Sequence, residues 1–478
     1  MVIDSNNSNE HFCIVGGGLA GTLLSILLAQ RGIRCDIYDK RPDSRKNEIG
    51  NGRSIVMSLS KRGWDALDEV GLHNKVEEIS VPKHARMVHH DDGSANVQQY
   101  GREDQALHSV NRRALNSLLL NRAEETGLVK LYFNYMCEEI DLDKGEIIFT
   151  SSIKDERVHK RYNRIIGADG IFSRVRNRIA ISTGCENGLI KHDYVYKEIL
   201  MPADKNCKWA IPEHYIHIWP RFKCFLVGMP NYNGTFTCTL FYSEKGLPSE
   251  DFSSENNILR FFEVNFPEVV PHIPNLTQQF LEKKSSYMFS VSSSAWTYQD
   301  KAVLIGDSAH AIVPFYGMGM NVAFEDCIIF NKLIDDHNLD WGKVFSEFFK
   351  IRKPQADSIA NLSLKNLTNL EHSVDKDFQF KWELERKIWE IYPDKWMPTY
   401  VMVAFSHIPF TRIEEISEKQ SNTLNYLTQQ KEIRGKFDSK EFPEVLAKYI
   451  EFHITNENYI NEYMLAVSKP GQSRAYNF

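Results

Sequence analysis

The chain places glycines and a carboxylate around a short apolar run near its start, in an arrangement that can bind phosphates. Gly16, Gly18 and Gly21 follow the β-favouring run Phe12–Val15 at the spacing GxGxxG. In this order the glycines permit a tight turn, the approach of backbone amides to a pyrophosphate, and close packing of a helix on a strand. A pyrophosphate would then lie at the positive end of the helix that follows.

The residues after these glycines predict a βαβ unit. Leu19–Arg31 has helix-forming apolar spacing, Gly32 ends that helix, and Arg34–Asp39 predicts a second strand. A carboxylate at Asp39 can accept hydrogen bonds from a ribose diol and repels a 2′-phosphate, which favours FAD or NAD over NADP here. We expect Arg41 to contact the same cofactor. A structural glycine turn in another α/β fold is the alternative.

Two later segments repeat a strand, a Gly-Asp turn and a helix. In Tyr162–Arg176 the strand runs into Asp169 and Gly170, and a helix begins near Ser173. Singly, such a pair is more often an ordinary turn.

The third segment is AVLIGDSAHAIVPFYGMGMNVAFED, Ala302–Asp326. A carboxylate at Asp307 can receive the hydroxyl of a ribityl chain. Consecutive amides at Met320 and Asn321, which open a helix from about Gly319, can face the electron-rich pyrimidine edge of a flavin.

The three segments in this order resemble the class A flavoprotein monooxygenases. The resemblance implies a p-hydroxybenzoate hydroxylase-like fold with a Rossmann-type FAD domain, in which Asp169 and Gly170 help with both FAD and NADPH and Asp307 holds the FAD ribitol. It also places Arg112, which opens the helix RRALNSLLLNRA, near the FAD pyrophosphate. A solvated arginine is the plain alternative for Arg112. The chain has no second GxGxxG motif for NADPH. This matches the class, in which NADPH docks transiently without a Rossmann domain of its own.

Six segments resemble the kynurenine 3-monooxygenase subfamily in particular, and the similarity spans about residues 11 to 405. The segments are GRSIVMSLSKRGWDAL (Gly52–Leu67), ARMVHH (Ala85–His90), YIHIWPR (Tyr215–Arg221), GTFTCTLF (Gly234–Phe241), GDSAHAIVPFYGMGMN (Gly306–Asn321) and MPTYVMVAF (Met397–Phe405). The resemblance implies hydroxylation of L-kynurenine to 3-hydroxykynurenine, in which NADPH reduces FAD and O2 forms a flavin C4a-hydroperoxide. The flavin carries this chemistry, so no catalytic side chain is expected.

This resemblance implies four residues that bind the amino-acid end of the substrate. They are Arg86, Tyr100, Asn366 and Tyr400. A guanidinium can bind a carboxylate through two parallel hydrogen bonds, and phenol and amide groups can complete the contacts. Each residue alone would more simply be a surface or core side chain. Pocket walls are expected from Phe236, Phe241, Pro314, Phe315 and Tyr316, with ordinary sheet core as the alternative.

One residue departs from the subfamily. Its loop reads GQGMN, whereas here Met318 takes the place of the glutamine, which can hydrogen-bond near the substrate's aryl ketone. Methionine keeps the volume but removes the donor and the acceptor. Another tryptophan-derived amino acid is therefore the second candidate substrate. A flavin-binding regulatory protein without oxygenase activity is a third hypothesis, and a halogenase is weaker because its WxWxIP motif is missing.

Composition excludes other classes. The 478 residues carry 63 acidic and 57 basic side chains without a block of like charge, so no nucleic-acid partner is expected. No metal site is predicted, because the close histidine pairs suit structural roles, and His310 is expected to pack or cap after Asp307. The polar first ten residues, the scattered cysteines and the mixed, charged residues 406–478 predict a cytoplasmic protein without a membrane anchor. A monomer or homodimer is expected.

We expect three domains. The FAD domain is predicted to be discontinuous, from residues 1–80, 102–180 and 290–335. Residues 81–101 and 181–289 would form a mostly antiparallel substrate-binding sheet, since runs such as HIWPRFKCFLVGMP alternate as strands do. Residues 336–478, with amphipathic stretches such as DKDFQFKWELERKIWEIY, would form a C-terminal helical domain.

Overall fold

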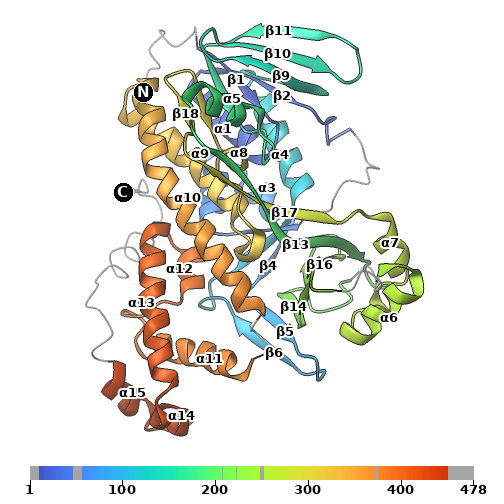
Figure 1. Cartoon of the computed structure of the whole chain (residues 1–478), viewed down its shortest axis with the longest axis vertical. Coiled ribbons are helices and arrows are strands. Elements are labelled where there is room, and N and C mark those ends of the chain that lie inside the picture. The colour runs from blue at the N-terminus through green and yellow to red at the C-terminus, as the bar shows by residue number, and fades with distance from the viewer. Residues whose placement is uncertain are drawn as a thin grey trace.

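The computed structural model describes residues 10–46, 56–206, 208–221, 223–247, 252–371 and 375–450. Residues 52–55 of the first subfamily segment and residues 451–478 of the predicted helical domain lie outside these ranges. Figure 1 shows a sheet with helices at one end of the molecule, a second sheet beside α6 and α7, and a group of helices from the C-terminal part of the chain.

A six-stranded, mostly parallel sheet contains the predicted βαβ unit. Its spatial order is β18 (Thr297–Tyr298), β19 (Ala302–Leu304), β12 (Arg164–Gly167), β1 (His11–Val15), β2 (Arg34–Asp39) and β8 (Val129–Phe133). Only β18 runs antiparallel to its neighbour. The strands come from three distant parts of the chain.

Two short sheets and several helices flank this sheet. The short sheets are β3 (Val56–Leu59), β7 (Leu107–Asn111) and β4 (Ser80–Lys83), and β11 (Arg157–Arg161), β10 (Glu146–Ser151) and β9 (Tyr135–Asp141). The helices are α1 (Leu19–Gln30), α2 (Lys61–Glu69), α3 (His73–Glu77), α4 (Arg112–Glu125), α5 (Arg174–Thr183), α8 (Asp307–His310) and α9 (Gly319–Asp336). Helix α1 is buried along almost its whole length because β1, α4 and α9 enclose it.

A seven-stranded, mostly antiparallel sheet forms the second unit. Its order is β17 (Ser286–Ser293), β13 (Asn187–Met201), β16 (Phe236–Ser243), β15 (Cys224–Pro230), β14 (Tyr215–Arg221), β5 (Ala85–His89) and β6 (Ala95–Gln99). Strand β17 runs past the expected boundary at residue 289. One face of the sheet packs on α6 (Glu255–Asn265), η3 (Val270–His272) and α7 (Leu276–Glu282). The other face packs on helices of the C-terminal part.

The C-terminal part is helical in the described range. Its helices are α10 (Trp341–Glu371), α11 (Lys376–Ile391), α12 (Thr399–Phe405), α13 (Phe410–Thr428), α14 (Lys431–Lys436) and α15 (Phe442–Ile450). The predicted amphipathic stretch forms α11, which Asp375 caps by accepting hydrogen bonds from two backbone amides. Among the described residues, no helix is long and apolar enough to cross a membrane.

A buried charge network joins α9 to this helical part. Arg352 of α10 donates to Glu325 at 2.9 Å and to Asp326 at 2.7 Å, and all three side chains are almost fully buried. Arg62 of α2 pairs with the other oxygen of Glu325, and His310 lies 2.5 Å from Asp326. His310 therefore has the packing role that its sequence context predicts. Burial opposes ionisation of both acids, but the surrounding cations hold the pKa of each below its usual value.

Candidate active site

The glycine-rich turn between β1 and α1 is tightly packed. Gly16 has a φ of +111°, and a Cβ atom there would lie 2.2 Å from the carbonyl oxygen of Ala168. A Cβ on Gly21 would lie 2.3 Å from the carbonyl oxygen of Gly16. Both glycines therefore allow β1, α1 and the turn after β12 to approach one another, in the roles that the GxGxxG spacing predicts.

Gly18 differs from these two glycines because it lies beside open space. It precedes α1 with a φ of −80°, and the nearest atom to an added Cβ would be Arg41 Nη2 at 3.9 Å. No side chain caps the first turn of α1. Its free amides and the space beside Gly18 together form a cradle that a pyrophosphate fits.

Asp39 lies at the end of β2, directly beside this cradle. Its carboxylate accepts hydrogen bonds from the Gly17 amide at 2.9 Å and from the Arg41 amide at 2.8 Å. The Arg41 guanidinium donates to both carboxylate oxygens, at 3.0 and 2.7 Å. Burial opposes ionisation, but these hydrogen bonds keep the pKa of Asp39 below its usual value. The ionised carboxylate that ribose binding requires is therefore present, with Arg41 already paired to it.

Helix α4 lies against the glycine turn. Asn111 caps it by accepting from the Arg113 and Ala114 amides, and Asn116 Nδ2 donates to the Gly17 carbonyl at 3.3 Å. Arg112 lies one turn before Asn116, so both project from the same side of α4. Within the described ranges no hydrogen bond or ion pair engages the half-buried Arg112 side chain. This position suits the predicted pyrophosphate contact.

Asp169 has a structural role that the resemblance alone does not indicate. Its carboxylate accepts hydrogen bonds from Ser173 Oγ at 2.5 Å and from the Arg174 amide at 2.7 Å, at the start of α5. Burial raises the pKa of Asp169, and these hydrogen bonds oppose the shift. Asp169 thus stabilises the turn in which Ala168 packs closely against Gly16. The next residue, Gly170, has a φ of +79° and open space beside it.

Asp307 is exposed at the start of α8, and among the described residues its carboxylate has no hydrogen-bond or ion-pair partner. Gly306, with a φ of +62°, brings this turn between α1 and α9, since a Cβ there would lie 3.0 Å from Ala323 Cβ and 3.3 Å from Ala20 Cβ. A free carboxylate between two helix N-termini fits the predicted contact with a ribityl hydroxyl.

The N-terminus of α9 presents uncapped backbone amides at Met320 and Asn321, since no side chain accepts from its first turn. The Asn321 side chain is fully buried. It donates to the Ser58 carbonyl at 2.8 Å and accepts from the Ser60 amide at 2.8 Å. Asn321 therefore fixes the start of α9 to the β3–α2 connection, while the amides are left for an electron-rich ring edge.

Three stacked tyrosines lie between the second sheet and α12. The rings of Tyr100 and Tyr400 lie 5.0 Å apart at 17°, and those of Tyr400 and Tyr316 lie 5.5 Å apart at 23°. Burial raises the pKa of all three phenols, that of Tyr400 to about 12, and the nearby Arg86 guanidinium opposes the shift in each. The structure thus brings together Arg86, Tyr100 and Tyr400 from three separate segments, with Tyr316 added.

Arg86 is held by a residue that sequence reasoning missed. Gln98 lies directly opposite Arg86 on β6, and its Oε1 accepts from Arg86 Nε at 2.5 Å. This leaves both terminal nitrogens of the guanidinium for a carboxylate. Gln98 is polar yet buried, and the alternation of β6 puts it on the same face as Arg86.

Asn366 of α10 reaches the same region. Its Nδ2 donates to the Phe315 carbonyl at 2.8 Å, so Asn366 holds the 3-10 turn η4 (Pro314–Tyr316) in place. The Phe315 ring lies about 6 Å from the rings of Tyr194, Phe225 and Phe241. Tyr194 and Phe225 thus belong to the same aromatic cluster, and the sequence prediction did not include them.

The prediction that Phe236 lines this pocket is wrong. Successive side chains of a strand point to opposite faces, so Phe236 and Phe241, five residues apart on β16, lie on different faces. Phe236 is fully buried in the core beneath α6 and α7. The alternative, ordinary sheet core, holds for this residue.

Met318 and Pro314 flank the tyrosines. Met318 is fully buried in the same apolar cluster as Tyr100 and Tyr316, and its sulfur lies 3.8 Å from Asn321 Nδ2. Pro314 is exposed at the start of η4. The residue that departs from the subfamily thus lies between the tyrosines and the start of α9.

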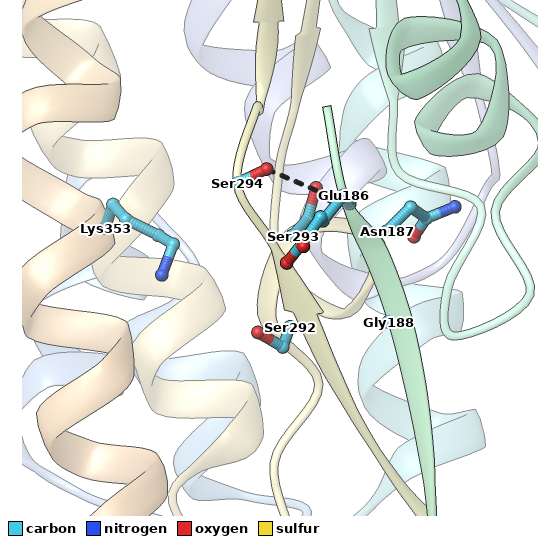
Figure 2. Close-up of a pocket in the computed structure, with 7 residues that line it drawn as sticks. All are labelled: Glu186, Asn187, Gly188, Ser292, Ser293, Ser294 and Lys353. Atoms are coloured by element: carbon cyan, nitrogen blue, oxygen red, sulfur yellow. Dashed lines mark hydrogen bonds between the residues drawn. The ribbon is translucent and has the colours of Figure 1, made fainter. Parts of the chain in front are cut away.

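A separate surface cavity of about 540 Å³ lies away from these residues. Figure 2 shows it between the start of β13, the end of β17 and Lys353 of α10. Ser294 Oγ donates to the Glu186 carbonyl at 3.2 Å, and Lys353 pairs with Asp357 at 2.5 Å. The cavity contains none of the predicted site residues and no aromatic wall, so it is not the candidate site.

Comparison with known proteins agrees with this geometry. A protein family described as FAD binding domain matches residues 10–335, which is more than half of the chain. The chain belongs to the class A flavoprotein monooxygenases. A kynurenine 3-monooxygenase of Flavobacterium johnsoniae is 36% identical over 440 residues, covering 92% of this chain and 97% of that protein. One of Legionella pneumophila (strain Corby) is 35% identical over 423 residues, covering 87% and 93%.

Two solved structures share the fold. The tetrameric form of 2-methyl-3-hydroxypyridine-5-carboxylic acid oxygenase superposes with a TM-score of 0.62 at 20% identity, covering 77% of this chain and 93% of that one. Pseudomonas aeruginosa PqsL, in complex with 2-aminobenzoylacetate, gives 0.62 at 18% identity, covering 76% and 97%. The predicted p-hydroxybenzoate hydroxylase-like fold and the use of FAD with NADPH are thereby confirmed.

Proposed function

We propose that this flavoprotein monooxygenase hydroxylates L-kynurenine to 3-hydroxykynurenine. The observation that supports this substrate most directly is the cluster of Arg86 with three stacked tyrosines next to the start of α9. In an α-amino acid with an aromatic side chain, the carboxylate can pair with the Arg86 cation and the ring can pack against the aromatic side chains. The similarity to relatives named kynurenine 3-monooxygenase over about nine-tenths of the chain supports the same choice.

In this proposal the protein binds and orients the substrate. Arg86 binds the carboxylate, Tyr100 and Tyr400 donate or accept hydrogen bonds beside it, and Asn366 keeps η4 in position. Phe315 and its aromatic neighbours enclose the ring and exclude water. Bound FAD supplies the redox chemistry, with NADPH as electron donor and O2 as oxidant. The cofactor would be held by Gly18, Asp39, Arg112, Asp307 and the first amides of α9.

Product identification tests the proposal. The purified protein should be yellow from bound FAD, and incubation with kynurenine, NADPH and air should give a product one oxygen heavier that co-elutes with 3-hydroxykynurenine. Kynurenine should also accelerate flavin reduction in stopped-flow measurements. Kynurenine is not the substrate if the protein consumes NADPH and makes only peroxide, or if kynurenine leaves the rate of flavin reduction unchanged. A colourless protein would instead favour the regulatory alternative.

Replacing Arg86 by glutamine should weaken kynurenine binding by about 10- to 100-fold. A hydrogen bond to a charged group contributes about 1.5–3 kcal/mol, and the variant loses both the charge and the paired geometry. The Kd is measured by fluorescence titration without NADPH. Arg102→Gln, which changes an exposed arginine on the connection after β6, is the control and should bind normally. Equal Kd values for both variants would remove Arg86 from the site.

The second candidate substrate, another tryptophan-derived amino acid, rests on Met318. Glutamine at this buried position would place an amide next to the tyrosine cluster, where it can reach the substrate's ketone. We expect Met318→Gln to raise kcat/KM for kynurenine about tenfold, the value of one neutral hydrogen bond. Met318→Leu is the apolar control and should leave kcat/KM unchanged. A glutamine variant no better than the leucine variant would show that residue 318 does not limit kynurenine turnover.

The cellular setting is also part of the proposal. Free, mostly buried cysteines among the described residues are consistent with a reducing cytoplasm. A monomer or homodimer remains the prediction for oligomeric state, to be measured by light scattering.

A further inference from the structure

Lys83, the last residue of β4, is fully buried. Within the described ranges no acidic side chain pairs with its ammonium group, and the hydrogen bond that it donates goes to Ser58 Oγ at 3.3 Å. Burying an ammonium group without a counterion is unfavourable. A lysine in this position therefore suits a site where negative charge arises on a bound group.

The register of the β3–β7–β4 sheet decides which way this lysine faces. Lys83 lies opposite Leu107 on β7, and Ser58 of β3 lies opposite Ser109, two residues further along the same strand. Because alternate residues of a strand share a face, these four side chains lie on one face of the sheet. Leu107 belongs to the apolar cluster that contains Met318 and the stacked tyrosines. The residues of β3 and β7 on the other face pack into the core of the parallel sheet instead.

Ser58 connects the lysine to the N-terminus of α9. The Ser58 carbonyl accepts from Asn321 Nδ2 at 2.8 Å, and a Cβ atom on Gly317 would lie 3.6 Å from Ser58 Oγ. Gly317 lies two residues before the start of α9. The hydroxyl that accepts from Lys83 is therefore next to the loop that leads into the uncapped amides of α9. A buried ammonium group and the positive end of a helix thus approach the same region.

The flavin gains negative charge when NADPH reduces it. Hydride transfer brings two electrons and one proton, so the ring gains one negative charge, at its pyrimidine edge. The amides at the start of α9 suit that edge, and a buried cation beside them acts through a medium that screens charge weakly. Such a cation favours the reduced ring over the uncharged oxidised ring.

We propose that Lys83, together with the first amides of α9, stabilises the negative charge that bound flavin gains on reduction and so raises the midpoint potential of the cofactor. This role concerns the cofactor, so it holds whichever aromatic substrate the enzyme hydroxylates. Burial lowers the pKa of Lys83 to about 7. A negative charge nearby raises that pKa again, so the lysine is protonated more fully when the flavin is reduced.

The midpoint potential of the holoenzyme without substrate tests this role. It is measured by spectroelectrochemistry for the wild type, Lys83→Met and Lys130→Met. Methionine has an unbranched side chain like that of lysine but no charge, and Lys130, exposed on β8, is the control. Reduction of Lys83→Met should be about tenfold less favourable, which lowers its two-electron potential by about 30 mV. Lys130→Met should keep the wild-type potential.

Sulfite binding gives a second readout, because sulfite adds to oxidised flavin and leaves the ring negatively charged. Its Kd should rise about tenfold in Lys83→Met. Urea unfolding of the apoproteins separates this effect from folding. Lys83→Met should unfold at the same urea concentration as the wild type or at a higher one, because the variant removes a buried charge that has no counterion.

An unchanged potential and an unchanged sulfite Kd in Lys83→Met would overturn the proposal. An apoprotein that unfolds at a lower urea concentration, or a variant that no longer binds oxidised FAD, would also overturn it, since Lys83 would then serve folding or binding instead of reduction. An equal fall in potential in Lys130→Met would show that the effect does not belong to Lys83.

Discussion

Replacing Gly16 by alanine should abolish FAD binding and lower the free energy of unfolding of the apoprotein by about 3 kcal/mol. The backbone at Gly16 has a φ of +111°, which other residues rarely adopt, and the added methyl would lie 2.2 Å from the Ala168 carbonyl oxygen. The contact partner is backbone, so it cannot swing aside. Flavin absorbance after purification and urea unfolding of the apoprotein measure the two effects.

Gly18→Ala separates cofactor binding from folding. Its backbone is in an ordinary conformation and its surroundings are open, so unfolding should change by less than about 1 kcal/mol. The methyl would nevertheless occupy the side from which backbone amides approach a pyrophosphate, and FAD affinity should fall. If Gly18→Ala retains full FAD affinity, the dinucleotide does not lie in this cradle.

Replacing Arg352 by methionine should lower the free energy of unfolding by about 3–5 kcal/mol, the cost of leaving a buried charge without its partner. Arg352 is 1% exposed and binds both Glu325 and Asp326. Methionine fills much of the volume but leaves the two buried carboxylates without their shared guanidinium, although Arg62, His310 and the Gly306 amide still contact them. Urea unfolding at pH 7 gives the value.

Lys350→Met, on the same helix, is the control. Lys350 forms an exposed pair with Glu347 at 3.3 Å, so its loss should cost under about 1 kcal/mol. The pH dependence provides a second check. Because the folded pKa values of Glu325 and Asp326 are depressed, the network stabilises the protein above about pH 4 and loses that contribution as the pH falls below it. The difference in unfolding free energy between the wild type and Arg352→Met should therefore shrink as the pH falls. A difference that stays constant would contradict this account.

The cofactor side of the site was largely predictable from sequence because each of its parts is local. Gly16, Gly18 and Gly21 follow a strand at fixed spacing, and the predicted second strand ends at Asp39 as β2 does. The helix predicted from about Gly319 begins at that residue. Turns and helix starts of this kind depend on a few neighbouring residues, so the sequence alone predicts them.

The substrate side was less predictable because it depends on which strands are neighbours. Family resemblance brought Arg86, Tyr100 and Tyr400 together, but nothing local to them indicates that β5 pairs with β6 so as to oppose Gln98 to Arg86. Phe236 and Phe241 lie on opposite faces of β16, and the packing of the whole sheet decides which face meets the tyrosines.

The central position of β1 in the sheet determines when during synthesis the cofactor site can form. Strand β1 lies between β2, which follows soon after it, and β12, which is made only after residue 163, while β19 comes more than a hundred residues later again. Contacts between such distant segments form slowly, and N-terminal parts otherwise tend to fold first on the ribosome. Strand β1 therefore stays unpaired on one edge until β12 has emerged, and the cofactor site stays incomplete until Asp307 and α9 have emerged. FAD loading is consequently a late event, and fragments ending before β19 should neither bind flavin nor fold.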